Sequence, residues 1–180
     1  MLVECGFVKA TAPDGAEFTF RPSFGRVAGL GDPQEIVRIY AGLFEPTAAK
    51  DAAYVLACLC DQDDATPLTG WTEDGVTHAG TMPQAEQILI ARHLMQHGIA
   101  GKARPGKGDG KFSDRFDAAE YISAARVHLG LSSADAETLS MTEFQSMLEM
   151  KFPQQSTERS VPSREEYDAA MARMKDMGHG

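Results

Sequence analysis

The sequence predicts a mainly α-helical (α+β) domain with a small N-terminal β-hairpin and a peripheral C-terminal helix. Three observations favour this class. Two alternating segments flank a turn near the N-terminus, several later segments carry apolar residues at helical spacing, and a polar linker precedes the last of them. Of the 180 residues, 43% are hydrophobic and 24% are charged, a composition typical of a globular protein.

The predicted N-terminal hairpin joins strands Leu2–Lys9 and Ala16–Arg21 through the turn sequence "APDGA". In the second strand Phe18 and Phe20 share one face, because side chains alternate along a strand. Pro22 then ends this strand, since proline lacks the N–H group that a strand ladder requires.

Two helices are expected after this hairpin. Asp32 is a suitable N-cap, and Pro33 a suitable first residue, for a helix that runs to Phe44. Thr47 is predicted to cap a second helix over residues 48–60. The residues expected to be buried on this second helix are Ala53, Leu56, Ala57 and Cys60.

A polar, turn-rich segment follows over residues 61–80. It contains the only tryptophan, Trp71, and predicts a short hairpin around "TEDG", residues 72–75. The next segment predicts a helix that Thr81 caps, with Pro83 in its first turn and Gly98 at its end.

Helical patterns continue over residues 113–153. Gly130 is expected to end the first of these helices, and Pro153 the last. The residues predicted to begin the successive helices are Ser113, then Ser132 or Ser133, then Ser140 or Thr142.

The sequence predicts a domain boundary after residue 153. Residues 1–153 form the hairpin and the helical globular domain, and residues 154–180 form a linker and a C-terminal tail. Within the tail, Ser163 followed by Glu166 is a capping-box arrangement and predicts a final helix.

The charge of the chain argues against a nucleic acid as its main partner. The net charge is −9 and the pI is near 5.0, whereas a protein that binds the phosphate backbone is usually basic. No apolar run approaches the roughly 18 residues of a membrane span. We therefore expect neither nucleic acid nor membrane among the partners, and no motif in the sequence calls for a cofactor.

The stretch Gly101–Lys111 resembles a phosphate-binding P-loop but lacks its decisive parts. Gly108 stands where the Ser or Thr that holds magnesium belongs, and Pro105 removes a backbone N–H from the loop. A P-loop also connects a buried strand to a helix, but a helix precedes this one. The stretch is interpreted as a basic linker.

His93 and His97 are four residues apart on a predicted helix and so lie on one face, as a pair of zinc ligands would. Leu94 stands where a zinc protease has its general-base glutamate, and no third ligand is evident. Partly buried structural histidines are the favoured interpretation, and a small metal-binding protein is the alternative. The sequence carries no signature of a catalytic nucleophile, so the chain is expected not to be an enzyme.

Methionine-rich helix faces adapt to different partner surfaces. Two such faces are predicted, one near residues 141–150 and one in the C-terminal tail. The candidate partner-binding residues are Met141, Phe144, Met147, Leu148, Tyr167, Met171 and Met174.

The order of the segments resembles a known family. The segments are "FRPSF", "GDPQEIVRIYAGL", "ARHLMQHGIAGKA", the stretch Asp117–Pro153 and a closing "SREEYDA". Together they resemble the tail assembly chaperones of long-tailed phages and prophages. The stretch Asp117–Pro153, with "LSMTEF" after a small helical corner, carries most of the resemblance.

The resemblance implies a non-enzymatic chaperone that binds the tape measure protein in the host cytoplasm and is absent from the mature virion. It further implies a homo-oligomer, with a frameshifted longer form and the tail tube protein as other partners. A virion component of the tail is the alternative that the sequence leaves open.

Overall fold

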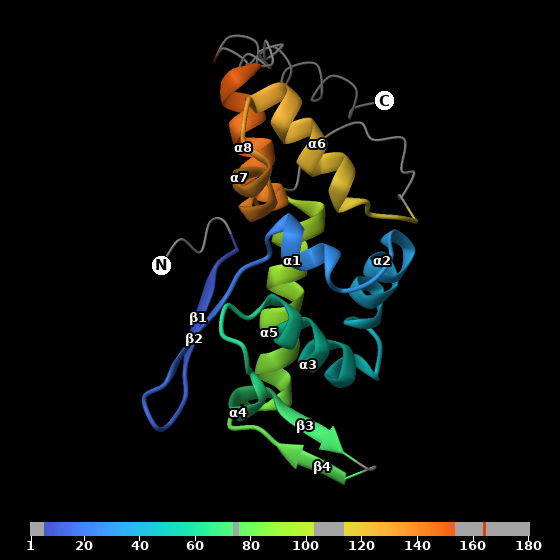
Figure 1. Cartoon of the computed structure of the whole chain (residues 1–180). Helices are drawn as coiled ribbons and strands as arrows, with labels where there is room; N and C mark the ends of the chain where they lie inside the picture. Colours follow the sequence, from blue (N-terminus) through green and yellow to red (C-terminus); the bar gives the residue numbers. More distant parts are fainter. Residues whose placement is uncertain (1–5, 74–75, 103–113, 154–163, 165–180) are drawn as a thin grey trace. The chain divides into compact units, whose positions relative to one another are not determined.

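A computed structural model of the chain describes residues 6–73, 76–102, 114–153 and 164, and these are mainly helical (Figure 1). The described part also contains two separate antiparallel strand pairs, so the predicted mainly α (α+β) class is confirmed. The chain divides into two compact units, Met1–Leu148 and Glu149–Gly180. The predicted boundary after residue 153 stays a prediction, and the predicted final helix lies outside the described residues apart from Arg164.

The first hairpin pairs β1 (Val8–Thr11) with β2 (Glu17–Phe20). Phe18 and Phe20 are 6% and 0% exposed, which confirms that their shared face is buried. Residues 2–5 of the predicted first strand lie outside the described residues, and the described strand begins at Val8 and ends at Thr11, two residues beyond the predicted end at Lys9. At Gly6 the backbone has φ +87°, and a Cβ there would overlap the His97 side chain, so the chain turns before it enters the strand.

The outer edge of β2 is closed by the residues that follow α3 (Ala48–Leu59). Phe20 forms a bridge with Cys60, and the Arg21 N–H donates to the Leu59 carbonyl at 2.9 Å. Thr19 uses both of its backbone groups on this side. Its carbonyl accepts from the Asp61 N–H at 2.7 Å, and its N–H donates to Gln62 Oε1 at 2.9 Å.

Two short helices follow the hairpin. Ser23 caps α1 (Phe24–Ala28), a helix that the sequence pattern did not predict. Asp32 caps α2 (Pro33–Gly42) as expected, because its Oδ1 accepts from the N–H groups of Gln34 and Glu35. The predicted α2 ran to Phe44, two residues beyond its observed end.

Helix α3 forms where it was predicted, but its cap and its buried face differ. The Thr47 side chain makes no capping hydrogen bond. Packing against α5 (Gln84–Met95) decides which face is buried. The buried residues within α3 are Ala48, Ala52, Val55, Leu56 and Leu59, whereas Ala53 is half-buried and Ala57 is exposed.

The predicted second hairpin is confirmed. It follows α4 (Thr66–Thr69) and pairs β3 (Gly70–Glu73) with β4 (Val76–Ala79). Every residue of the two strands except Gly70 is exposed, so the hairpin contributes little to the core.

Helix α5 begins and ends differently from the prediction. Thr81 does not cap it, because its N–H and hydroxyl both donate to the Pro67 carbonyl, and Pro83 occupies the N-cap instead. Gly98 does not end it either. A π-helical turn, η2 (Gln96–Ala100), continues the helix, and Gly101 with φ +73° terminates it.

The remaining helices form a corner made of α6 (Ala118–Leu129), α7 (Ser133–Thr138) and α8 (Met141–Lys151). Gly130 is left-handed and ends α6, and Ser132 caps α7, as predicted. Asp117 caps α6, whereas the predicted cap Ser113 lies outside the described residues. Ser140 and Glu143 form a capping box at the start of α8.

An aromatic cluster joins this corner to α1. The Tyr121 ring lies 5.7 Å from the Phe24 ring and 5.0 Å from the Phe116 ring, measured between centroids. Phe144 meets Phe24 edge to face at 5.9 Å. Such aromatic pairs add about 0.5–1.5 kcal/mol each beyond their burial, so this cluster anchors α6 and α8.

Candidate functional site

The candidate partner-binding residues on α8 divide between core and surface. Met141 and Phe144 are 3% and 5% exposed, and they pack in the core rather than on a surface that a partner can reach. Met147 and Leu148 are half-buried. The other three candidates, Tyr167, Met171 and Met174, lie outside the described residues.

His93 and His97 lie together, with their ring centroids 4.6 Å apart. His97 Nδ1 lies 2.8 Å from the Thr142 hydroxyl, whereas His93 Nε2 is buried without a hydrogen-bond partner in the described part. Burial lowers the pKa of both rings, and His93 lowers that of His97 further. Among the described residues no group of three His, Cys, Asp or Glu side chains is placed to hold a metal ion.

The start of the predicted basic linker is attached to α8. Gln145 Oε1 accepts a hydrogen bond from the Lys102 N–H at 2.8 Å, and Gln145 Nε2 donates to the Ala100 carbonyl at 3.4 Å. Residues 103–113, which contain most of the predicted linker, lie outside the described part of the chain.

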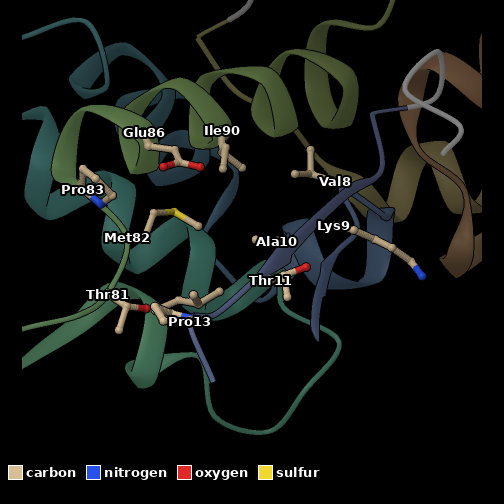
Figure 2. Close-up of a pocket in the computed structure, with 11 residues that line it drawn as sticks. Val8, Lys9, Ala10, Thr11, Pro13, Thr81, Met82, Pro83, Glu86 and Ile90 are labelled. Atoms are coloured by element: carbon tan, nitrogen blue, oxygen red, sulfur yellow. The ribbon is translucent and has the colours of Figure 1, made fainter. Parts of the chain in front are cut away.

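A groove of about 390 Å³ lies between β1 and the start of α5 (Figure 2). Its volume falls in the range of protein ligand sites, about 300–1,000 Å³. Apolar residues line much of it, but polar atoms make up the greater part of its exposed surface. The lining residues are Val8, Lys9, Ala10, Thr11, Pro13, Leu68, Thr81, Met82, Pro83, Glu86 and Ile90.

The backbone of β1 forms one wall of this groove. Val8, Lys9, Ala10 and Thr11 are consecutive and all line it. Because side chains alternate between the faces of a strand, four consecutive residues can line one groove only where the strand presents its edge. The groove therefore runs beside the open edge of the first hairpin.

The pairing of the hairpin determines which backbone groups face this edge. The Ala12 N–H donates to the Ala16 carbonyl at 2.8 Å, which makes these residues a hydrogen-bonded pair in the same register as the strands. Hydrogen-bonded and non-hydrogen-bonded pairs alternate in an antiparallel ladder. Lys9 and Thr11 therefore direct their N–H and C=O groups away from β2 and toward the open edge.

Glu86 is the acidic residue of the groove. It is exposed on α5, and Figure 2 shows its carboxylate on the groove side of the helix, between Pro83 and Ile90. Within the described residues it forms no ion pair and no side-chain hydrogen bond. Lys9 directs its ammonium group away from the groove centre in the same view, so Glu86 sets the charge of the groove.

Exposed apolar side chains also lie on α5 and just after the end of α2. Phe44 and Leu89 are 59% and 68% exposed. The Arg92 guanidinium lies 4.7 Å from the centroid of the Phe44 ring, and Arg92 Nε donates to the Leu43 carbonyl at 2.8 Å. Leu89 is one turn before Arg92 on the same helix, so we name Phe44, Leu89 and Arg92 the α5 patch.

Comparison with protein families gives one assignment. The model of a family of unknown function, DUF6246, matches residues 43–169, which is more than half of the chain. The chain belongs to this family. No curated protein and no solved structure matches it.

The family match covers only one wall of the groove. Leu68, Met82, Glu86 and Ile90 lie within the matched residues, whereas β1 precedes them. The DUF6246 portion of the chain thus supplies the acidic residue and the apolar floor, and the preceding hairpin supplies the backbone edge.

Sequence reasoning did not identify this groove. Alternation predicted β1, and helical spacing predicted α5, but neither signal indicates that the two elements lie beside each other.

The described residues include no helix with the length and hydropathy to cross a membrane.

Proposed function

We propose that the chain is a non-enzymatic tail assembly chaperone that binds the tape measure protein of a long-tailed phage. In this proposal it acts in the host cytoplasm, forms homo-oligomers and is absent from the mature virion. A tape measure protein is a long helical chain with exposed apolar stripes, and such stripes aggregate when they are left uncovered.

The observation that carries the proposal is the groove beside the open edge of β1. It offers a partner polypeptide both apolar contacts and backbone hydrogen bonds. The α5 patch adds exposed apolar surface that suits a helical segment of the partner. The net charge of −9 favours the solubility of a complex whose apolar surfaces are covered.

Co-expression with a fragment of the tape measure protein from the same phage tests the proposal. We expect the fragment to be soluble with the chaperone and to aggregate without it. Leu89→Asp, which places a carboxylate in the α5 patch, should reduce the soluble yield, whereas Glu45→Asp on an exposed site outside the patch should not.

Two results would contradict the proposal. The first is a tape measure fragment that stays equally insoluble with and without the chain. The second is the chain as a stoichiometric component of purified particles by mass spectrometry, which would instead support a virion structural protein.

A further inference from the structure

We propose that the open edge of β1 binds an extended segment of a partner polypeptide as a third strand of the first hairpin. The segment places alternate apolar side chains in the groove and a lysine or arginine against Glu86. This inference deepens the proposed function and rests on it only in assuming that the groove binds a polypeptide.

The backbone groups at the open edge suit an added strand. Lys9 and Thr11 each present one N–H and one C=O to the open edge, because Val8, Ala10 and Ala12 use theirs toward β2. An added strand can pair with these groups by the same ladder geometry. The opposite edge is unavailable, since Thr19 already bonds to Asp61 and Gln62 there.

The side chains across the groove suit a strand with one apolar face. Leu68, Met82 and Ile90 lie across the groove from β1, and Leu68 and Met82 are 2% and 6% exposed. Alternate side chains of an added strand point to the same face. One face of the bound segment therefore meets this apolar floor, so it should carry Val, Ile or Leu at every second position.

The charge of the groove favours a basic side chain in the bound segment. Glu86 is one of two charged residues that line the groove, and the other, Lys9, directs its ammonium group away from the centre (Figure 2). With no ion-pair partner for Glu86 in the described part of the chain, a lysine or arginine of the bound segment is its natural complement. An acidic segment would be repelled.

A synthetic peptide with one lysine tests strand addition, apolar contact and charge complementarity on the full-length protein. The probe is fluorescently labelled acetyl-SVTKTVS-amide, in which the two valines and the lysine share one face. Its affinity is measured by fluorescence anisotropy. We expect saturable binding, and binding at least about fivefold weaker when glutamate replaces the lysine, because the carboxylate then faces Glu86.

Backbone N-methylation separates strand addition from simple apolar adhesion. N-methyl groups at alternate residues block only one edge of an extended peptide. Two peptides are compared, one methylated at the odd-numbered residues and one at the even-numbered residues. One of them should bind at least about tenfold more weakly, and the other should bind nearly as the unmethylated peptide does. Equal affinities of the two methylated peptides would overturn the proposal.

Matched protein variants locate the peptide. Thr11→Pro removes an N–H at the open edge, whereas Glu17→Pro changes the register partner of Thr11 and removes an N–H that faces the opposite edge. Glu86→Gln removes the groove carboxylate, and Glu45→Gln removes an exposed carboxylate elsewhere. Thr11→Pro should weaken peptide binding, and Glu86→Gln should abolish the preference for lysine over glutamate. The two control variants should bind as the unmodified protein does.

Circular dichroism and thermal unfolding of every variant establish whether it is folded. If a proline variant does not fold, Glu86→Gln still tests the proposal. Equal affinity of all folded variants would overturn the inference. So would a Thr11→Pro protein that loses self-association in sedimentation but still binds the peptide, because the edge would then serve a second copy of this chain. Peptide binding without any effect on the tape measure fragment would instead contradict only the proposed function.

Discussion

The two β-hairpins of this chain have strands of equal length but differ in what their side chains contact. In β1–β2, Phe18 and Phe20 are 6% and 0% exposed and form part of the core. In β3–β4, Trp71 and Val76 are 46% and 57% exposed. The first hairpin is therefore held by burial, and the second mainly by its own ladder and by cross-strand pairs.

The second hairpin shows what remains when burial is absent. Trp71 stacks on His78 with the ring centroids 4.5 Å apart, and the hydroxyls of Thr72 and Thr77 lie 3.3 Å apart. Such cross-strand pairs contribute only about 0.2–1 kcal/mol each. A two-stranded hairpin alone is marginally stable in water, and the close packing of Gly80 against the Leu68 carbonyl and the Gly70 nitrogen supports the base of this one.

The largest effect is expected from Phe20→Ala in the first hairpin. This removes a ring that is 0% exposed and leaves a cavity, so the free energy of unfolding should fall by about 3–5 kcal/mol. Urea denaturation followed by circular dichroism measures this loss. A loss below about 1 kcal/mol would mean that the first hairpin does not depend on burial.

Gly80→Ala should have the next largest effect, at the base of the second hairpin. A Cβ on Gly80 would overlap the Leu68 carbonyl and the Gly70 nitrogen, both of which are backbone atoms that cannot move aside easily. The expected cost is about 2–3 kcal/mol, measured by urea denaturation.

Gly15→Ala, in the turn of the first hairpin, is the matched control for this substitution. Gly15 has φ +89°, but a Cβ there would meet nothing within 4 Å. Only the strained backbone contributes, at about 1 kcal/mol. Equal losses from the two substitutions would show that small shifts of the neighbouring backbone relieve the overlap at Gly80.

Acid should destabilise the fold around His93 and His97, where His97 contacts Thr142 of α8. Burial lowers the pKa of His93 and His97 below the ordinary value of 6.5, so the unfolded chain binds protons more readily than the folded one. The stabilisation is present above pH 6.5 and is lost as the pH falls toward the lowered folded-state pKa values. Urea denaturation at a series of pH values measures this loss.

The double variant His93→Gln/His97→Gln is the control for the pH dependence. It removes both titrating rings, so the decline in stability just below pH 6.5 should flatten. The same decline in the double variant would assign the effect to other groups.

The smallest effect is expected from Trp71→Ala. Because the side chain is 46% exposed, its removal should lower the free energy of unfolding by less than about 1 kcal/mol despite the loss of the stack on His78. Thermal unfolding beside Phe20→Ala gives the comparison directly. A loss as large as that of Phe20→Ala would show that the second hairpin is not peripheral to stability.

Local signals in the sequence predicted the elements well. Asp32 and Ser132 cap helices as expected, because a cap requires only residues within one turn. Thr81 does not cap the helix because its hydroxyl donates a hydrogen bond to the Pro67 carbonyl, fourteen residues earlier. A competing partner at that separation is not visible in a local pattern.

Features that depend on contacts between distant elements were predicted less well from the sequence. The predicted buried face of α3 differs from the observed one. Alanine and other small residues lie on several faces of this helix, and its packing against α5 determines which face is buried. Helical spacing likewise showed that Met141 and Phe144 share an apolar face but not that this face belongs to the core. The groove needs β1 beside α5, a contact that no single segment encodes.

The closed outer edge of β2 limits how the first hairpin can grow. Arg21 and Asp61 form an ion pair at 2.6 Å there, and the backbone groups of Thr19 are occupied. A sheet that extends indefinitely needs an open edge on both sides. With this side sealed, the first hairpin can add a strand on one side alone, so pairing between the first hairpins of two copies ends at a dimer and does not continue into a fibre.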